Sequence, residues 1–159
     1  MEADIPVGPT PEGVKVGPKK SAFAGISFTA LALLGLALFC FFNFRTVIVS
    51  GNSMLPTFTN GQRLVACKAY WLVGPIKDND VVVIKMGKQG DYIIKRVYRT
   101  AGESVEWYNV PESWKLINGE YRVPSGEIYV LGDNQKVSED SRSFGAVPVE
   151  HVVGKILRI

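Results

Sequence analysis

The sequence predicts an all-β domain preceded by one N-terminal transmembrane helix. Two observations lead to this prediction. An uncharged apolar run extends over residues 22–42, and beyond residue 45 short alternating or β-branched stretches are separated by turn signals such as Asn-Gly and Gly-Pro. The 159 residues are enough for one domain with its own hydrophobic core in addition to such a helix.

Residues 21–44 are expected to form the membrane anchor. The run from Ala22 to Phe42 holds 21 residues without a charge or a proline, and about 20 helical residues cross a bilayer. A buried globular helix is a poorer interpretation, because such a helix rarely lacks a polar face. A cleaved signal peptide has a shorter apolar region that ends at small residues, whereas this run ends in Phe41 and Phe42.

The charges around this run predict the orientation of the chain. Lys15, Lys19 and Lys20 precede it, and Arg45 alone follows closely. The positive-inside rule then places the N-terminus in the cytoplasm. Residues 1–20, with three glycines, four prolines and few large apolar residues, are expected to be a disordered cytoplasmic tail, and residues 45–159 an extracytoplasmic domain.

Composition narrows the classes of function. The formal net charge is +3, which is not the basic stripe of a nucleic-acid-binding protein, so no nucleic-acid partner is expected. No cluster of residues has metal-ligand spacing, and no metal or cofactor is expected. Cys40 lies inside the apolar run and Cys67 outside it, so the domain is expected to fold without a disulfide.

Seven segments after the apolar run have the pattern of strands, and no helical periodicity of useful length appears there. The expected strands cover residues 46–49, 63–68, 80–85, 92–98, 104–108, 127–131 and 152–157.

Ser53 is a candidate nucleophile. It stands between Gly51-Asn52 and Pro56, where glycine permits close approach of a substrate and proline stiffens the chain. An ordinary polar turn would look similar. Ser53 follows Phe42 by only 11 residues, so it must lie near the membrane surface if the apolar run is an anchor.

Lys95 is a candidate base. If residues 92–98 form a strand, Lys95 shares a face with Ile93 and Val97. Burial disfavours the ammonium form and can make a lysine basic near neutral pH. The alternative is a lysine that lies along an apolar surface and extends its charged end into water. A Ser-His-Asp triad could use only His151, and a Ser-Lys pair needs no histidine.

Four motifs in the correct order give the chain a family resemblance. They are Gly51-Asn52-Ser53-Met54-Leu55-Pro56-Thr57, then Asp80-Val81-Val82-Val83, then Ile94-Lys95-Arg96-Val97, and finally Gly132-Asp133-Asn134 followed by Ser138-x-Asp140-Ser141-Arg142 and Gly145. Together they resemble the motifs of type I signal peptidases, over residues 20–159. These serine-lysine enzymes remove N-terminal signal peptides from exported proteins.

The resemblance implies a compact domain of coiled antiparallel sheets and assigns roles to single residues. Ser53 would be the nucleophile, Lys95 the general base and Ser138 the residue that orients the base. Asp140 and Arg142 would pair and support the site. The substrate would be a signal peptide with small residues at the first and third positions before the cut. Four residues are candidates for lining the substrate pocket: Val47, Val49, Met54 and Ile94.

The resemblance also implies that the protein contacts membrane lipid and works together with the secretion translocon. A bacterial plasma-membrane enzyme is favoured over a mitochondrial inner-membrane signal peptidase, because residues 1–20 have no Arg-rich presequence. Two departures from the family pattern stand out. Gly51 lacks the hydroxyl that completes the oxyanion hole in some members, and Asn79 stands where glycine is common.

Three other interpretations remain. A non-catalytic anchored β-module that binds peptides would need neither Ser53 nor Lys95. A self-cleaving repressor-type peptidase would be soluble and carry a DNA-binding part, and the sequence indicates neither feature. A sortase-like transpeptidase would use Cys67 with His151, although Cys67 lies in the middle of an expected strand.

Overall fold

The computed structural model describes residues 22–87, 90–111, 113–114 and 120–157, except for the side chains of residues 22–26. The chain divides into two compact units, Met1–Leu36 and Ala37–Ile159. The predicted tail over residues 1–20 lies outside the described residues, so it remains a prediction.

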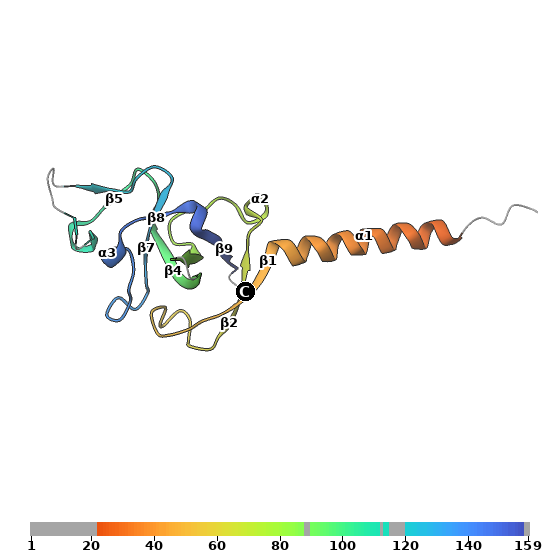
Figure 1. Ribbon diagram of the computed structural model, residues 1–159, viewed down its shortest axis with the longest axis horizontal. Helices are drawn as coiled ribbons and strands as arrows, with labels where there is room; N and C mark the ends of the chain where they lie inside the picture. The colour runs from red at the N-terminus through yellow and green to blue at the C-terminus, as the bar shows by residue number, and fades with distance from the viewer. Residues whose placement is uncertain (1–21, 88–89, 112, 115–119, 158–159) are drawn as a thin grey trace, which may run out of the picture. The chain divides into compact units, whose positions relative to one another are not determined.

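Helix α1 covers Ala22–Asn43, where the apolar run predicted a helix (Figure 1). Large apolar side chains along it are exposed, among them Phe28 and Leu31. Among the described residues, however, no helix is both long enough and apolar enough to cross a membrane. The prediction for residues 21–44 is therefore confirmed as a helix but not as a membrane span.

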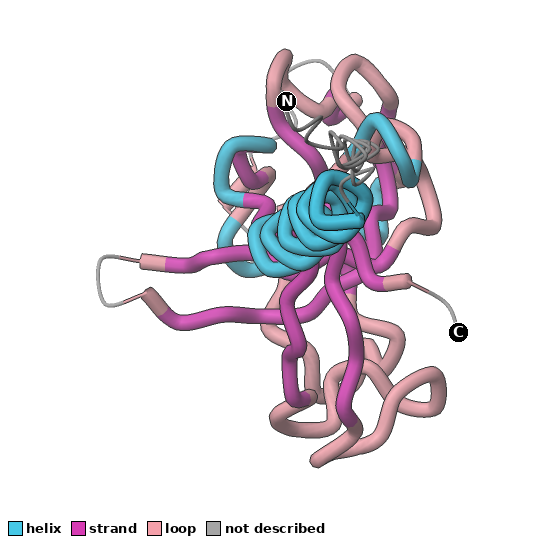
Figure 2. Tube along the Cα trace, turned by 90° about the vertical axis from the view of Figure 1, so that its right-hand side faces the viewer, coloured by secondary structure: helices cyan, strands magenta, loops and turns pink. Residues whose placement is uncertain are grey.

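The second unit is built on one antiparallel sheet of seven strands in the order β1-β2-β9-β3-β4-β7-β8 (Figures 1 and 2). The strands of this sheet are β1 Phe44–Ile48, β2 Arg63–Cys67, β3 Val81–Met86, β4 Asp91–Arg99, β7 Glu127–Leu131, β8 Val147–Pro148 and β9 Val152–Ile156. A separate antiparallel pair joins β5 Ser104–Val105 to β6 Tyr121–Arg122. The predicted mostly antiparallel β architecture is thus confirmed.

Short elements account for most differences from the sequence prediction. The strand expected over residues 104–108 ends at Val105 and gives way to the 3₁₀-helix η1, Trp107–Asn109. Strands β6 and β8 have two residues each, too few to show an alternating pattern. Three short helical segments also escaped prediction: α2 Tyr70–Val73, α3 Ser141–Phe144 and η2 Val149–His151.

The sheet curls, so that one of its faces is concave. Three strands separate β1 from β4 in the sheet order, yet Val47 of β1 and Ile94 of β4 pack against one hydrophobic cluster. Val82 and Val97 belong to a second cluster. Neighbouring residues of β3 and β4 thus enter different clusters, as the alternation of side chains in a strand requires. Both cysteines are free, as expected, and Cys67 is fully buried.

Candidate active site

Lys95 lies in the middle of β4 and is 4% exposed. Its neighbours two residues away, Ile93 and Val97, belong to one hydrophobic cluster, as the alternation along a strand predicted. A lysine with an exposed end would keep its ammonium group in water. The structure therefore favours the buried alternative for Lys95.

Burial changes the protonation of Lys95. Desolvation lowers the pKa of its ammonium group below the ordinary value, and the nearby carboxylates of Asp140 and Glu139 oppose part of this shift. The pKa remains lowered on balance. A larger share of the neutral amine is then present at a given pH than for a lysine in water.

Ser138 is the hydrogen-bond partner of Lys95. The Nζ atom of Lys95 donates to Ser138 Oγ at 3.0 Å. Ser138 belongs to the loop after β7, 43 residues further along the chain. The structure therefore brings together Lys95 and Ser138, which the family resemblance assigned to one site, while the orienting role of Ser138 remains a prediction.

Gly132 allows the nucleophile loop to approach this pair. A Cβ atom on Gly132 would lie 2.1 Å from Ser138 Oγ and 2.7 Å from the backbone oxygen of Ser53. Both distances are shorter than van der Waals contact. The loop after β7, which contains Gly132, also binds Ser53 directly, since the Asn134 N–H donates to the Ser53 carbonyl oxygen at 2.9 Å. Gly132 thus lies between Ser53 on one side and Ser138 on the other.

Ser53 occupies the turn-rich connection between β1 and β2. The next residue, Met54, is 1% exposed and anchors this connection in the core. In the described part of the chain no hydrogen bond joins Ser53 Oγ to Lys95 Nζ. The two residues are placed in one neighbourhood, and a working dyad remains a prediction. Catalytic hydrogen bonds are often made only once substrate is bound.

Asp140 and Arg142 form a bidentate ion pair. Arg142 donates from Nε and Nη2 to the two carboxylate oxygens of Asp140, at 2.9 Å each. Asp140 also accepts from the Gly132 N–H at 3.0 Å and caps the start of α3. Burial raises the pKa of Asp140, but hydrogen bonds from Arg142 and Gly132 outweigh it and hold the pKa below the usual value. The carboxylate is therefore charged.

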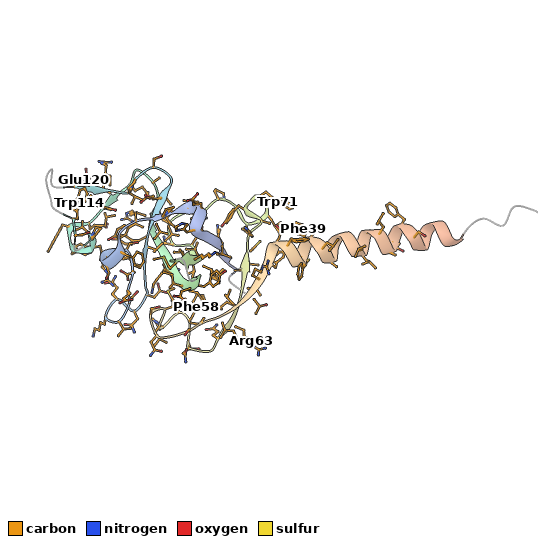
Figure 3. All side chains as sticks on the ribbon, viewed as in Figure 1. Phe39, Phe58, Arg63, Trp71, Trp114 and Glu120 are labelled. Atoms are coloured by element: carbon orange, nitrogen blue, oxygen red, sulfur yellow. The ribbon has the colours of Figure 1, made fainter. Side chains whose placement is uncertain are left out.

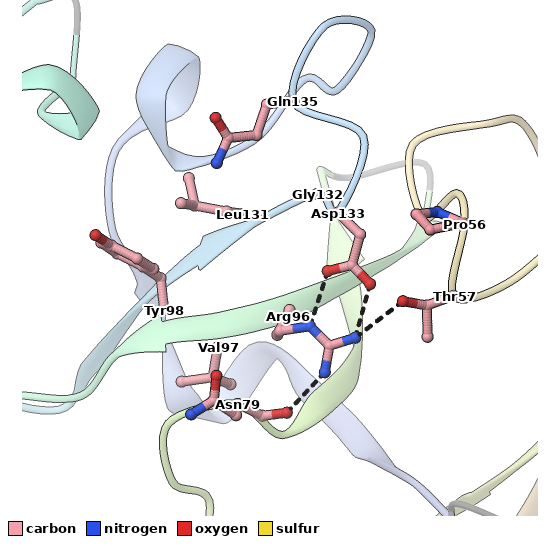
Figure 4. Close-up of a pocket in the computed structure, with 10 residues that line it drawn as sticks. All are labelled: Pro56, Thr57, Asn79, Arg96, Val97, Tyr98, Leu131, Gly132, Asp133 and Gln135. Atoms are coloured by element: carbon pink, nitrogen blue, oxygen red, sulfur yellow. Dashed lines mark hydrogen bonds and ion pairs between the residues drawn. The ribbon is translucent and has the colours of Figure 1, made fainter.

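A second bidentate pair was missed by sequence reasoning. Arg96 donates to Asp133 from Nε at 2.8 Å and from Nη2 at 2.7 Å, and from Nη1 to the Asn79 carbonyl at 2.9 Å (Figure 4). A longer bond of 3.4 Å reaches Thr57 in the nucleophile loop. Asn79 has φ of 70°, which explains why glycine suits this position. The signal in the sequence was the placement of Arg96 on the strand face opposite Lys95.

The four predicted pocket residues lie together. Val49 and Met54 are buried in the cluster against which Val47 and Ile94 pack. Val49 and Met54 are thus core residues, whereas Val47 and Ile94 are half-buried. That these residues line a substrate pocket remains a prediction.

The residues of the sortase-like alternative do not suit that chemistry. Cys67 has 0% exposure in β2, so its thiol cannot meet a substrate. His151 is exposed in η2. The structure offers no support for a Cys-His site here.

Known proteins resemble this chain over most of its length. The family model described as signal peptidase, peptidase S26, matches residues 22–111 and 108–159. A signal peptidase I from Bacillus caldolyticus is 34% identical over 158 residues, which cover 81% of this chain and 85% of the relative. A signal peptidase IB from Staphylococcus aureus (strain COL) is 29% identical over 170 residues, covering 87% of this chain and 88% of the relative.

A crystal structure of a signal peptidase I from Enterococcus faecalis V583 also matches, at 24% identity and a TM-score of 0.39, over 53% of this chain and 97% of that chain. The sequence matches make the chain a peptidase. It belongs to the signal peptidase family, peptidase S26.

Proposed function

We propose that this chain is a serine endopeptidase that removes N-terminal signal peptides from exported proteins, with Ser53 as nucleophile and Lys95 as general base. The observation that carries the proposal is the environment of Lys95. The amine is buried, its pKa is lowered, and it bonds Ser138 beside the Gly132 contact with Ser53. A serine hydroxyl needs a base to take its proton, and this lysine is suited to that role.

The proposed reaction has two stages, acylation of Ser53 and hydrolysis of the acyl-enzyme. Neutral Lys95 accepts the proton of Ser53 Oγ as that oxygen attacks the scissile carbonyl. The lysine then gives the proton to the leaving amine, and water later hydrolyses the acyl-enzyme with Lys95 again as base.

The oxyanion needs hydrogen-bond donors. In the described part of the chain the backbone N–H of Ser53 has no partner, which leaves it available to the developing oxyanion. Gly51 has φ of 86°, a conformation that a residue with a side chain rarely adopts. Glycine at this position therefore suits the backbone, and no hydroxyl is proposed as a second donor there.

Specificity would come from the apolar concave surface. Val47, Val49, Met54 and Ile94 would hold small side chains at the first and third positions before the cut. An apolar pocket discriminates by roughly 10–200-fold for each methylene-sized change. Alanine at these positions should therefore be accepted, and phenylalanine or lysine rejected.

The location at a bacterial plasma membrane is also part of the proposal, with residues 1–20 as the cytoplasmic tail, 21–44 as the anchor and 45–159 as the catalytic domain outside. The support is the uncharged sequence of residues 22–42 and the exposure of its large apolar side chains. Signal peptides emerging from the secretion translocon would meet the site at the membrane surface.

Lys95→Arg is the decisive test of the dyad. Arginine keeps the charge and much of the length but stays protonated in proteins, so the variant should be as inactive as Ser53→Ala towards a preprotein. Lys136→Arg, an exposed lysine of the neighbouring loop, is the matched control and should keep its activity. A correctly folded Lys95→Arg protein with near wild-type cleavage would exclude Lys95 as the base. If Ser53→Ala were equally unaffected, the chain would instead be a non-catalytic peptide-binding module.

A further inference from the structure

A groove opens on the concave face of the sheet beyond the proposed pocket. Its volume is about 530 Å³, and it is lined by residues from β1, β3, β4 and β9 and from the segments next to β1 and β2. The lining residues are Phe42, Arg45, Thr46, Val47, Lys68, Val83, Tyr92 and Val153. We call this cavity the basic groove.

The basic groove is continuous with the proposed pocket. Val47 belongs to both, and Val83 of the groove packs in the same cluster as Val49 and Met54. Val83 is also the registered partner of Ile94 in the sheet. Tyr92, two residues before Ile94, therefore lies on the same face of β4. A substrate chain that leaves the pocket along this face enters the groove.

The charged residues at the rim of the groove are all positive. Arg45 on β1 and Lys68 after β2 are both exposed, and no acidic residue is among the lining residues. The floor, by contrast, is apolar and includes the buried Val83 and the half-buried Val153. The groove thus combines an apolar floor with a cationic rim.

The spacing along β1 relates the groove to positions in a substrate. Arg45 precedes Val47 by two residues, which is about 7 Å in a strand. β1 leads towards Ser53, so residues further from the cut lie nearer Arg45. If the third residue before the cut meets Val47, the side chain about two positions further upstream meets Arg45 and Lys68.

We propose that the basic groove holds the substrate segment upstream of the third position, and that Arg45 and Lys68 select against basic residues about five positions before the cut. This inference rests on the proposed function. Like charges placed together across an interface are unfavourable and opposite charges are favourable. Substrates with a neutral or acidic residue there should therefore be cut faster than substrates with lysine.

The test uses the full chain in detergent and three peptides. Each peptide has alanine at the first and third positions before the cut and differs only at the fifth, which is glutamate, alanine or lysine. We expect kcat/KM for the lysine peptide to be roughly tenfold below that for the glutamate peptide. The difference should shrink at high salt, because the rim cations are exposed to solvent and screened.

Charge reversal identifies the residues responsible. In the double variant Arg45→Glu, Lys68→Glu the lysine peptide should become the better substrate. Arg63→Glu is the matched control. Arg63 is exposed on β2 next to Leu64, so it points away from the concave face, and it lies at the edge of the second unit (Figure 3). This control should keep the wild-type preference.

The outcomes separate the inference from the function on which it rests. Equal kcat/KM for all three peptides with the wild-type chain would overturn the basic groove as a selective site, and so would a preference that the double variant leaves unchanged. Failure to cut any peptide would contradict the proposed function instead.

Discussion

At the scale of single residues, the protonation of Lys95 should control the rate. A lysine is neutral above its pKa, and burial lowers the pKa of Lys95 below that of free lysine, which is about 10.4. Activity should therefore rise with pH, with a midpoint below that value, and level off at higher pH. The midpoint is measured from a pH profile of kcat/KM with a peptide that does not itself titrate in this range. A rate that falls on raising the pH from 7 to 9, with the fold intact, would contradict Lys95 as the base.

Ser138 should act through Lys95. Ser138→Ala removes the acceptor of the Lys95 hydrogen bond, and the loss of one hydrogen bond to a charged or reacting group costs about 1–3 kcal/mol. We expect kcat to fall roughly 5–150-fold and the midpoint of the pH profile to move, since Lys95 changes its surroundings. Ser143→Ala, at an exposed position of the following helix α3, should change neither. An unaltered rate and pH profile in Ser138→Ala would make Ser138 a residue of the loop alone.

Gly132 sets the distance between the nucleophile loop and the base. An alanine there would meet both a side chain and the Ser53 backbone at less than 3 Å, and the backbone cannot rotate away as a side chain can. Gly132→Ala should therefore displace Ser53 and lower kcat by roughly 100-fold, the effect of misplacing a reacting group by about 1 Å. Gly35→Ala, where no atom lies within 4 Å, is the control. Full activity of Gly132→Ala would show that this contact is not needed.

At the scale of elements, the loop from β7 to α3 depends on the charge of Asp140. Asp140 is 0% exposed and binds Arg142 and the Gly132 N–H. Breaking a buried pair costs about 3–5 kcal/mol, so Asp140→Asn should lower the free energy of unfolding by about 3 kcal/mol at neutral pH. Glu120→Gln, in the exposed pair with Arg122, should change it little.

The ion pair of Asp140 and Arg142 should also make the stability of the fold depend on pH. The pKa of Asp140 in the folded protein is below its ordinary value, so its stabilisation is present at neutral pH and is lost as the pH falls through the folded pKa. Denaturation in urea at several pH values measures this. The stability difference between wild type and Asp140→Asn should therefore narrow in acid. A difference that stays constant down to pH 2 would contradict the assignment.

Elements with a periodic pattern of apolar residues could be predicted from the sequence, and short elements without such a pattern were missed. The strand around Lys95 was foreseen because β4 has nine residues with alternating environments. Helix α3 has four residues, and its start depends on the Asp140 cap rather than on periodicity. The Arg96–Asp133 pair joins residues 37 apart in sequence. The alternation placed Arg96 on its strand face, but its partner depends on the pairing of β4 with β7, in which Arg96 is registered with Leu131, two residues before Asp133, and a strand order cannot be derived from periodicity.

At the scale of the whole molecule, the chain is expected to behave as a membrane protein with its catalytic domain outside the cell. The proposed anchor includes Leu34 near its middle. A charge at the centre of a span costs about 2.5–3.5 kcal/mol on insertion scales. Leu34→Arg should therefore weaken retention in membranes washed with alkaline carbonate, whereas Leu34→Ile should be retained as the wild type is. Complete extraction of the wild-type chain by carbonate would contradict the anchor.

The orientation across the membrane can be decided by labelling single cysteines in intact cells. The native Cys40 is exposed and Cys67 is buried, so Cys40→Ser removes the accessible background. In that chain Arg122→Cys places a thiol at the exposed position of β6, and Gly8→Cys places one in the proposed tail. An impermeant maleimide should label the thiol at position 122 directly, and the thiol at position 8 only after the cells are opened. The three lysines before the apolar run, against one arginine closely after it, are the physical reason. Labelling of position 8 but not of position 122 in intact cells would reverse the orientation and place the site on the cytoplasmic side, where exported signal peptides would not reach it.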